Sequence, residues 1–113
     1  MKKLLALFIL LGGVSYPGSF VSGSAACSSS GAVQVSTTYI ALRQITVSAL
    51  LANTGKIYIG GSNVSATSSP PIGGELGAGY SYNATDVANT LSPTTLYIAC
   101  TVSSDNVSWI GRQ

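Results

Sequence analysis

The 113-residue sequence has no histidine, only two cysteines and very little charge. Charged residues make up 7% of the chain, against about 25% in ordinary soluble domains. The missing imidazole excludes a Ser-His-Asp triad and leaves the cysteines without the base that would activate a catalytic thiol. Two cysteines also fall short of the four Cys or His ligands of a structural zinc site. The residue types therefore predict a protein that is not an enzyme and has no cofactor or metal.

The few charges are scattered along the chain. The formal net charge is +2 and the basic residues do not cluster, so we expect no nucleic-acid partner. The only carboxylates, Glu75, Asp86 and Asp105, are too dispersed for a glycosidase pair or a calcium loop, and we interpret them as solvated turn residues. We expect no small-molecule substrate. A chain with so little charge is suited to packing against neighbours or to life outside the cell.

Residues 1–26 have the order of charges and apolar residues of a secretory leader. Lys2 and Lys3 precede an apolar run from Leu4 to Val14, and Ser24-Ala25-Ala26 supplies small residues before a cleavage point. The run is too short to cross a bilayer, which takes about 20 residues. The alternative is an uncleaved apolar arm that is buried under a neighbouring subunit. The residues of that arm would be Leu4, Leu5, Leu7, Phe8, Ile9, Leu10 and Leu11.

Cys27 and Cys100 are a candidate disulfide. In an oxidising compartment the bond would close a loop of 73 residues, which the chain-entropy model values at about 4 kcal/mol. In a particle assembled in the cytoplasm they would instead be two reduced, buried thiols. The sequence leaves both states open, and a membrane is involved only if the leader is a secretion signal.

After a linker at residues 27–32, residues 33–113 alternate between apolar and polar positions. This period of two is typical of short strands with one buried face. The apolar positions predicted to face the core include Val33, Val35, Ile45, Val47, Ala49, Ile57, Ile59, Leu96, Ile98, Cys100, Val102, Val107 and Trp109. We expect an all-β domain, a small antiparallel β-sandwich or barrel of about six to eight short strands.

The turns between these strands supply further predictions. Residues 52–56, ANTGK, predict a three-residue hairpin with Gly55 in the left-handed conformation, and residues 103–106, SSDN, predict a second hairpin. A single helical turn is expected around residues 86–89. The uncharged stretch after Gly61 predicts a long connection with Val64 as an inward anchor. Its candidate subunit-contact residues are Ser62, Asn63, Val64, Pro70 and Pro71.

Five aromatic residues have two interpretations. They are Tyr58, Tyr80, Tyr82, Tyr97 and Trp109. We favour positions in the core or at a subunit interface over a carbohydrate-stacking face.

Two stretches, QITVSALLANTGKIYIGGSNVSATSSPPIGGELGAGYSY and TTLYIACTVSSDNVSWIG, resemble a β-sandwich module that recurs in virion proteins of tailed bacteriophages. The resemblance covers about two thirds of the chain and includes no catalytic motif. It implies a structural module of phage heads, fibres or tails. The leader-like residues 1–26 depart from that module.

The resemblance implies a capsid decoration subunit that stabilises the particle through protein–protein contacts. Its partners would be the major capsid protein, other virion proteins and further copies of itself as a homo-oligomer, and its location would be the virion surface. The alternative is a secreted or cell-surface binding module, with a cleaved leader, one disulfide and an aromatic face for a ligand such as a carbohydrate.

Overall fold

The structure is a computed structural model, and it describes residues 19–28, 31–86, 88 and 90–113. Nearly all regular structure is β-strand. The strands are β1 (Phe20–Ala26), β2 (Val33–Gln34), β3 (Gln44–Ala49), β4 (Ile57–Gly60), β5 (Gly74–Leu76), β6 (Ser81–Thr85), β7 (Tyr97–Cys100) and β8 (Asn106–Arg112), with one short 3₁₀ helix, η1 (Pro93–Thr95).

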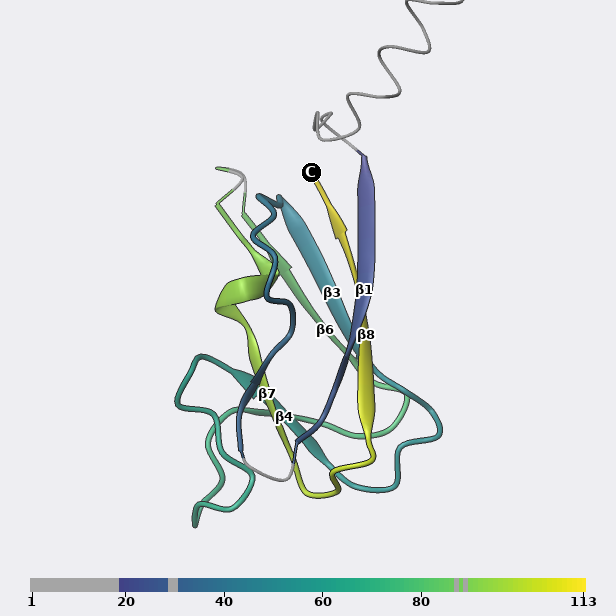
Figure 1. Ribbon diagram of the computed structural model, residues 1–113, viewed down its shortest axis with the longest axis vertical. Coiled ribbons are helices and arrows are strands. Elements are labelled where there is room, and N and C mark those ends of the chain that lie inside the picture. Colours follow the sequence, from purple (N-terminus) through teal and green to yellow (C-terminus); the bar gives the residue numbers. More distant parts are fainter. Residues whose placement is uncertain (1–18, 29–30, 87, 89) are drawn as a thin grey trace, which may run out of the picture.

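The eight strands form two antiparallel sheets of four, which confirms the predicted β-sandwich (Figure 1). The strand orders are β1-β8-β3-β6 and β2-β7-β4-β5. Six of the seven connections along the chain pass from one sheet to the other, and only β4 and β5 are neighbours in both sequence and sheet. This arrangement is an eight-stranded jelly roll, in which two Greek keys close into a sandwich.

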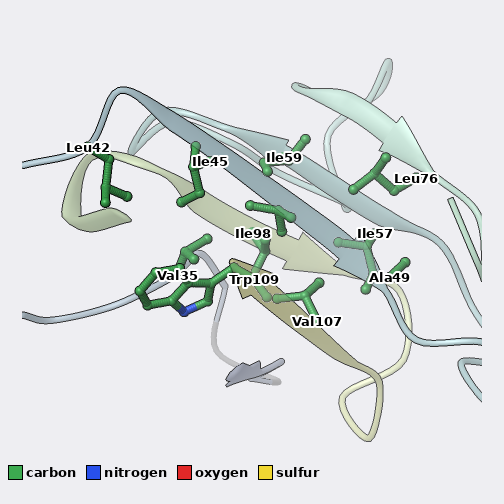
Figure 2. Close-up of a cluster of buried hydrophobic side chains, with 11 residues drawn as sticks. Val35, Leu42, Ile45, Ala49, Ile57, Ile59, Leu76, Ile98, Val107 and Trp109 are labelled. Carbon is green, nitrogen blue, oxygen red and sulfur yellow. The ribbon is translucent and has the colours of Figure 1, made fainter. Parts of the chain in front are cut away.

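The core lies between the sheets and comes from the alternating positions that the sequence predicts (Figure 2). Along β3 the burial pattern alternates strictly, with Ile45, Val47 and Ala49 buried. Val107 and Trp109 of the neighbouring strand β8 lie beside them on the same inner face of the sheet. Ile57, Ile59 and Ile98 close the core from the second sheet. Burial of these side chains supplies most of the stabilisation available to a domain of this size.

The two predicted hairpins are wrong. Residues 50–56 join β3 to β4, and residues 101–105 join β7 to β8, but in both cases the strands lie in different sheets. The positive-φ glycines of the described residues are Gly31, Gly73 and Gly79, so Gly55 is not in the left-handed conformation. A turn composition fixes a change of chain direction, but it does not decide which strands pair.

The structure includes part of the predicted leader in the sandwich. Phe20–Ala26, assigned above to the leader, form β1 and pair along their whole length with β8. Gly23, next to the small residues that look like a cleavage site, lies opposite Trp109, where an added Cβ would lie 2.8 Å from Nε1 of the indole. Cleavage after Ala26 would remove this strand. The apolar residues Leu4, Leu5, Leu7, Phe8, Ile9, Leu10 and Leu11 lie outside the described residues, as does part of the linker.

Two further features escaped the sequence patterns. β5 has only three residues and follows a stretch rich in serine and proline, so no alternation marks it. η1 begins after Ser92, whose buried hydroxyl accepts a hydrogen bond from the Thr94 backbone N–H.

The helical turn expected at 86–89 lies partly outside the described residues. Of the residues that the structure describes, none belongs to a helix that could cross a membrane.

Close packing against Leu42 predicts that Gly111→Ala destabilises the domain. A Cβ at position 111 would lie 2.5 Å from Cδ1 and 3.0 Å from Cδ2 of the fully buried Leu42. We expect the free energy of unfolding in urea to fall by about 1–3 kcal/mol. In the control Gly61→Ala, the new Cβ meets only the Asn63 side chain at 3.7 Å, and the change should stay below about 0.5 kcal/mol. Equal losses in both variants would contradict the described packing.

Candidate functional site

Asp105 holds two crossing loops together at one end of the sandwich. Its carboxylate accepts hydrogen bonds from the backbone N–H of Thr54, at 2.9 Å, and of Gly55, at 2.8 Å. The residue is only 3% exposed, so the sequence-based assignment of a solvated turn residue is wrong. Both carboxylate oxygens are satisfied by backbone donors, which offsets the cost of burying the charge.

A glycine is required at position 55 by space rather than by backbone conformation. An added Cβ would collide with the Thr101 hydroxyl and lie 2.7 Å from Cγ2 of Val102. The close approach lets the neighbouring backbone bond across the loops. Thr101 N–H donates to the Lys56 carbonyl at 3.0 Å, and Lys56 N–H donates to the Thr101 hydroxyl at 2.9 Å.

Asn53 adds a reciprocal pair of hydrogen bonds to the same junction. Its side-chain amide donates to the Asn106 carbonyl at 2.7 Å, and its side-chain oxygen accepts from the Asn106 N–H at 3.0 Å. Asn53, Thr54 and Gly55 of one loop are thus bound to Asp105 of the other loop and to Asn106, the first residue of β8. We call these five residues the loop junction.

The disulfide joins a third crossing segment to the loop junction. Cys27 and Cys100 are bonded, with their Cα atoms 5.9 Å apart, so the structure has the disulfide that the sequence left open. Cys27 follows β1 in one sheet and Cys100 ends β7 in the other. The Cys27 N–H also donates to the Asp105 carbonyl at 3.0 Å. Covalent and hydrogen bonds therefore tie both sheets at this end, the lower end of Figure 1.

The three carboxylates do not come together as a chemical site. Glu75 forms a 3.4 Å ion pair with Lys56 in which both side chains are more than half exposed, so it contributes little to stability. Hydrogen bonds from the Thr90 hydroxyl and then the Ala88 N–H lower the pKa of Asp86 below its ordinary value by favouring the ionised carboxylate. Within the described residues no group of three or more His, Cys, Asp or Glu could hold a metal ion.

The predicted contact loop folds against the outer face of the second sheet. Val64 is 5% exposed and packs with Tyr58 and Ala99 in a small second cluster, as expected for an inward anchor. Ser65 and Ile72 pair across the base of the loop. The other residues named for subunit contact, Ser62, Asn63, Pro70 and Pro71, are exposed, and their contact role stays a prediction.

The five aromatic residues do not form one face. Trp109 is buried between the sheets and Tyr58 is buried under the Val64 loop. Tyr97 is half-buried against the same small cluster. Tyr80 and Tyr82 alone are strongly exposed, at 70% and 39%. A shared carbohydrate platform therefore has no support from their placement.

An exposed apolar patch at the lower end of the first sheet was not found from the sequence. It consists of Leu50, Leu51 and Tyr80, whose exposed fractions are 38%, 84% and 70%. The Ala49 N–H donates to the Tyr80 carbonyl, which brings the loop after β3 beside the start of β6. The alternation of β3 stops at Ala49, and the apolar Leu50 and Leu51 that follow it directly are the signal that the sequence offers for this patch.

Comparison of the chain with protein-family models, curated proteins and solved structures gives no match. The function proposed below therefore draws on the geometry of the chain and on the sequence resemblance stated above.

The buried carboxylate predicts a large effect of Asp105→Asn. The amide can accept at only one atom and would turn an N–H group toward a backbone N–H of the loop. We expect a loss of about 2 kcal/mol in the free energy of unfolding. The control Glu75→Gln, at an exposed ion pair, should change it by less than about 0.5 kcal/mol. A neutral Asp105→Asn would show that the loop junction does not stabilise the fold.

Loss of the disulfide should cost more than any single hydrogen bond. Removing the closure of a 73-residue loop in the double variant Cys27→Ala/Cys100→Ala should lower the free energy of unfolding by about 4 kcal/mol. The reduced wild-type protein, measured in the same urea series, should lose a similar amount. A wild-type protein whose midpoint is unchanged by reductant would contradict this assignment.

Proposed function

We propose that this protein is a structural subunit of a bacteriophage particle, located on the capsid surface and acting by protein–protein contact. The jelly-roll strand order supports this, because that architecture serves in viral capsid domains. It also serves in lectins, so the fold alone does not choose a function. The resemblance of residues 44–82 and 94–111 to phage virion modules favours the capsid role over the lectin role.

The observation that carries the proposal is the apolar patch of Leu50, Leu51 and Tyr80. Leucine and tyrosine side chains this exposed, on two loops that a backbone hydrogen bond joins, are typical of a surface that a partner covers. The loop junction holds the loop of the two leucines, because Leu50 N–H donates to the Asn106 carbonyl at 3.2 Å, and the bond from Ala49 N–H to the Tyr80 carbonyl holds the second loop beside it. A rigid patch loses little conformational entropy on binding, which favours a stable contact.

Low charge and the disulfide are compatible with a particle surface. Surface sites buried by neighbours need little charge for solubility, and many weak contacts in a symmetric shell add up by multivalency. Disulfides persist on virion surfaces after release, as they do in other oxidising environments. The contact partners would be the major capsid protein and sister copies.

A second candidate function is a secreted or cell-surface binding module. The disulfide favours it, because a bond between Cys27 and Cys100 forms readily on the secretory route. In this alternative the leader is removed upstream of β1, and the exposed residues bind an extracellular ligand instead of a capsid.

The two functions are separated by where the chain accumulates. In the host that carries the gene, we expect phage particles purified on a density gradient to contain the chain in many copies. The variant Leu51→Asp should be depleted from particles at least about tenfold, since it places a charge in the contact patch. Tyr39→Asp, at an apolar residue 68% exposed beyond the other end of β3, should incorporate normally.

Recovery of the chain only from the medium, free of particles and lacking its leader by intact mass, would contradict the virion role and support the secreted module.

A further inference from the structure

Strand β1 presents an unpaired backbone edge. The N–H of Gln113 donates to the Ser19 carbonyl and the N–H of Cys27 donates to the Asp105 carbonyl, at the two ends of the β1–β8 ladder. In an antiparallel ladder, hydrogen-bonded residues alternate with residues whose backbone groups point the other way. The odd-numbered residues of β1 therefore bond β8. The even-numbered residues, Phe20, Ser22, Ser24 and Ala26, direct four N–H and four C=O groups away from the sheet.

This edge lies open along the border of the molecule. β1 is the first strand of its sheet, and β8 is its partner on the other side (Figure 1). Between β1 and the segment that contains β2 lies a solvent-open groove, with Trp109 among its lining residues. Phe20 is 68% exposed, and Ser22, Gly23 and Ser24 are exposed as well. No described segment of the chain covers the edge.

The edge of β1 also lacks the features that prevent pairing with another strand. Natural edge strands are guarded by charge, proline, bulges or shortness. Two other edges of the sandwich are short, with two residues in β2 and three in β5, and β5 carries Glu75. β6 has five residues and is followed at once by Asp86. β1 has seven residues, no charge, no proline and a ladder without a bulge.

We propose that β1 pairs with β1 of a second copy, antiparallel about a two-fold axis, and joins the two four-stranded sheets into one. Only the register centred on Gly23 pairs all seven residues and also directs the even-numbered residues toward each other. It places Ser22 opposite Ser24 of the second copy and Phe20 opposite its Ala26. Every pair is uncharged, so the strand is complementary to itself.

Gly23 suits the position on the axis. In this register the two glycines form the pair that is not hydrogen-bonded, where opposing Cα atoms approach to about 4.5 Å. The position cannot carry a side chain, because a Cβ there would lie 2.8 Å from Nε1 of Trp109. A second copy is favoured over a charged peptide as the occupant, since the edge offers no charge to recognise one.

This inference rests on the contact role proposed above and names one of its partners, a second copy. The β1 pairing is tested with purified protein. If the purified chain does not dimerise, incorporation into particles is still decided separately by the density-gradient experiment. A seven-residue ladder buries a small area, and we expect a dimer in the micromolar range that is reinforced in an assembly.

The first test blocks the edge while sparing the fold. Ser24→Pro removes an N–H that the β1–β8 ladder does not use, and proline is tolerated at such edge positions. Sedimentation velocity up to about 100 µM should show a dimer for the full wild-type chain and a monomer for Ser24→Pro. Ser24→Ala, which keeps the N–H, should remain a dimer. Far-ultraviolet circular dichroism verifies the fold of each variant.

The second test concerns the register and holds even if the proline variant fails to fold. In Ser22→Lys/Ser24→Lys, like charges face each other across the axis, and we expect the dissociation constant to rise at least about tenfold. In Ser22→Asp/Ser24→Lys, each aspartate faces a lysine of the second copy, and the dimer should persist.

A wild-type chain that stays monomeric up to about 100 µM overturns the proposal. A folded Ser24→Pro variant that still dimerises also overturns it, because another surface must then hold the copies together. A dimer lost equally in both charge variants overturns the register centred on Gly23.

Discussion

The carboxylate of Asp105 fixes the point where the chain passes between the two sheets. Each sheet of a jelly roll is assembled from strands distant in sequence, so the loops that cross between the sheets determine whether the sheets align. Asp105 and Asn106 bind Asn53, Thr54 and Gly55 of the opposite crossing loop, and Cys27 and Cys100 add a covalent link beside them. With these bonds in place, β3 and β8 pair in one sheet while β4 and β7 pair in the other.

The inner face of the sandwich could be predicted from the sequence, and the pairing of strands could not. Alternation of apolar residues identifies which side of a strand is buried, as for Ile45, Val47, Val107 and Trp109. Alternation does not identify the neighbouring strand across the ladder, so the turn compositions ANTGK and SSDN predict hairpins that the structure does not contain. The burial of Asp105 could not be predicted for a related reason. A carboxylate in a turn looks solvated until the partner loop that buries it is known.

The N-terminal boundary shows how one composition can serve two roles. Ser24, Ala25 and Ala26 have the small side chains of a cleavage site, and in the structure they belong to an edge strand beside β8. The apolar patch of Leu50, Leu51 and Tyr80 could not be predicted from the sequence, because it depends on how the chain folds. Leu51 and Tyr80 are far apart in sequence, and only the backbone bond between Ala49 and Tyr80 brings their loops together.

The alignment of the two sheets depends most directly on the loop junction, and amide hydrogen exchange tests that junction residue by residue. Surface-loop amides ordinarily exchange fast, because they open without unfolding the domain. The N–H groups of Thr54 and Gly55 are bound to the buried Asp105 carboxylate, so they should exchange as slowly as those of β3 and β8. Exchange of these two amides at the rate of an unstructured peptide would contradict the loop junction and the described alignment of the two sheets.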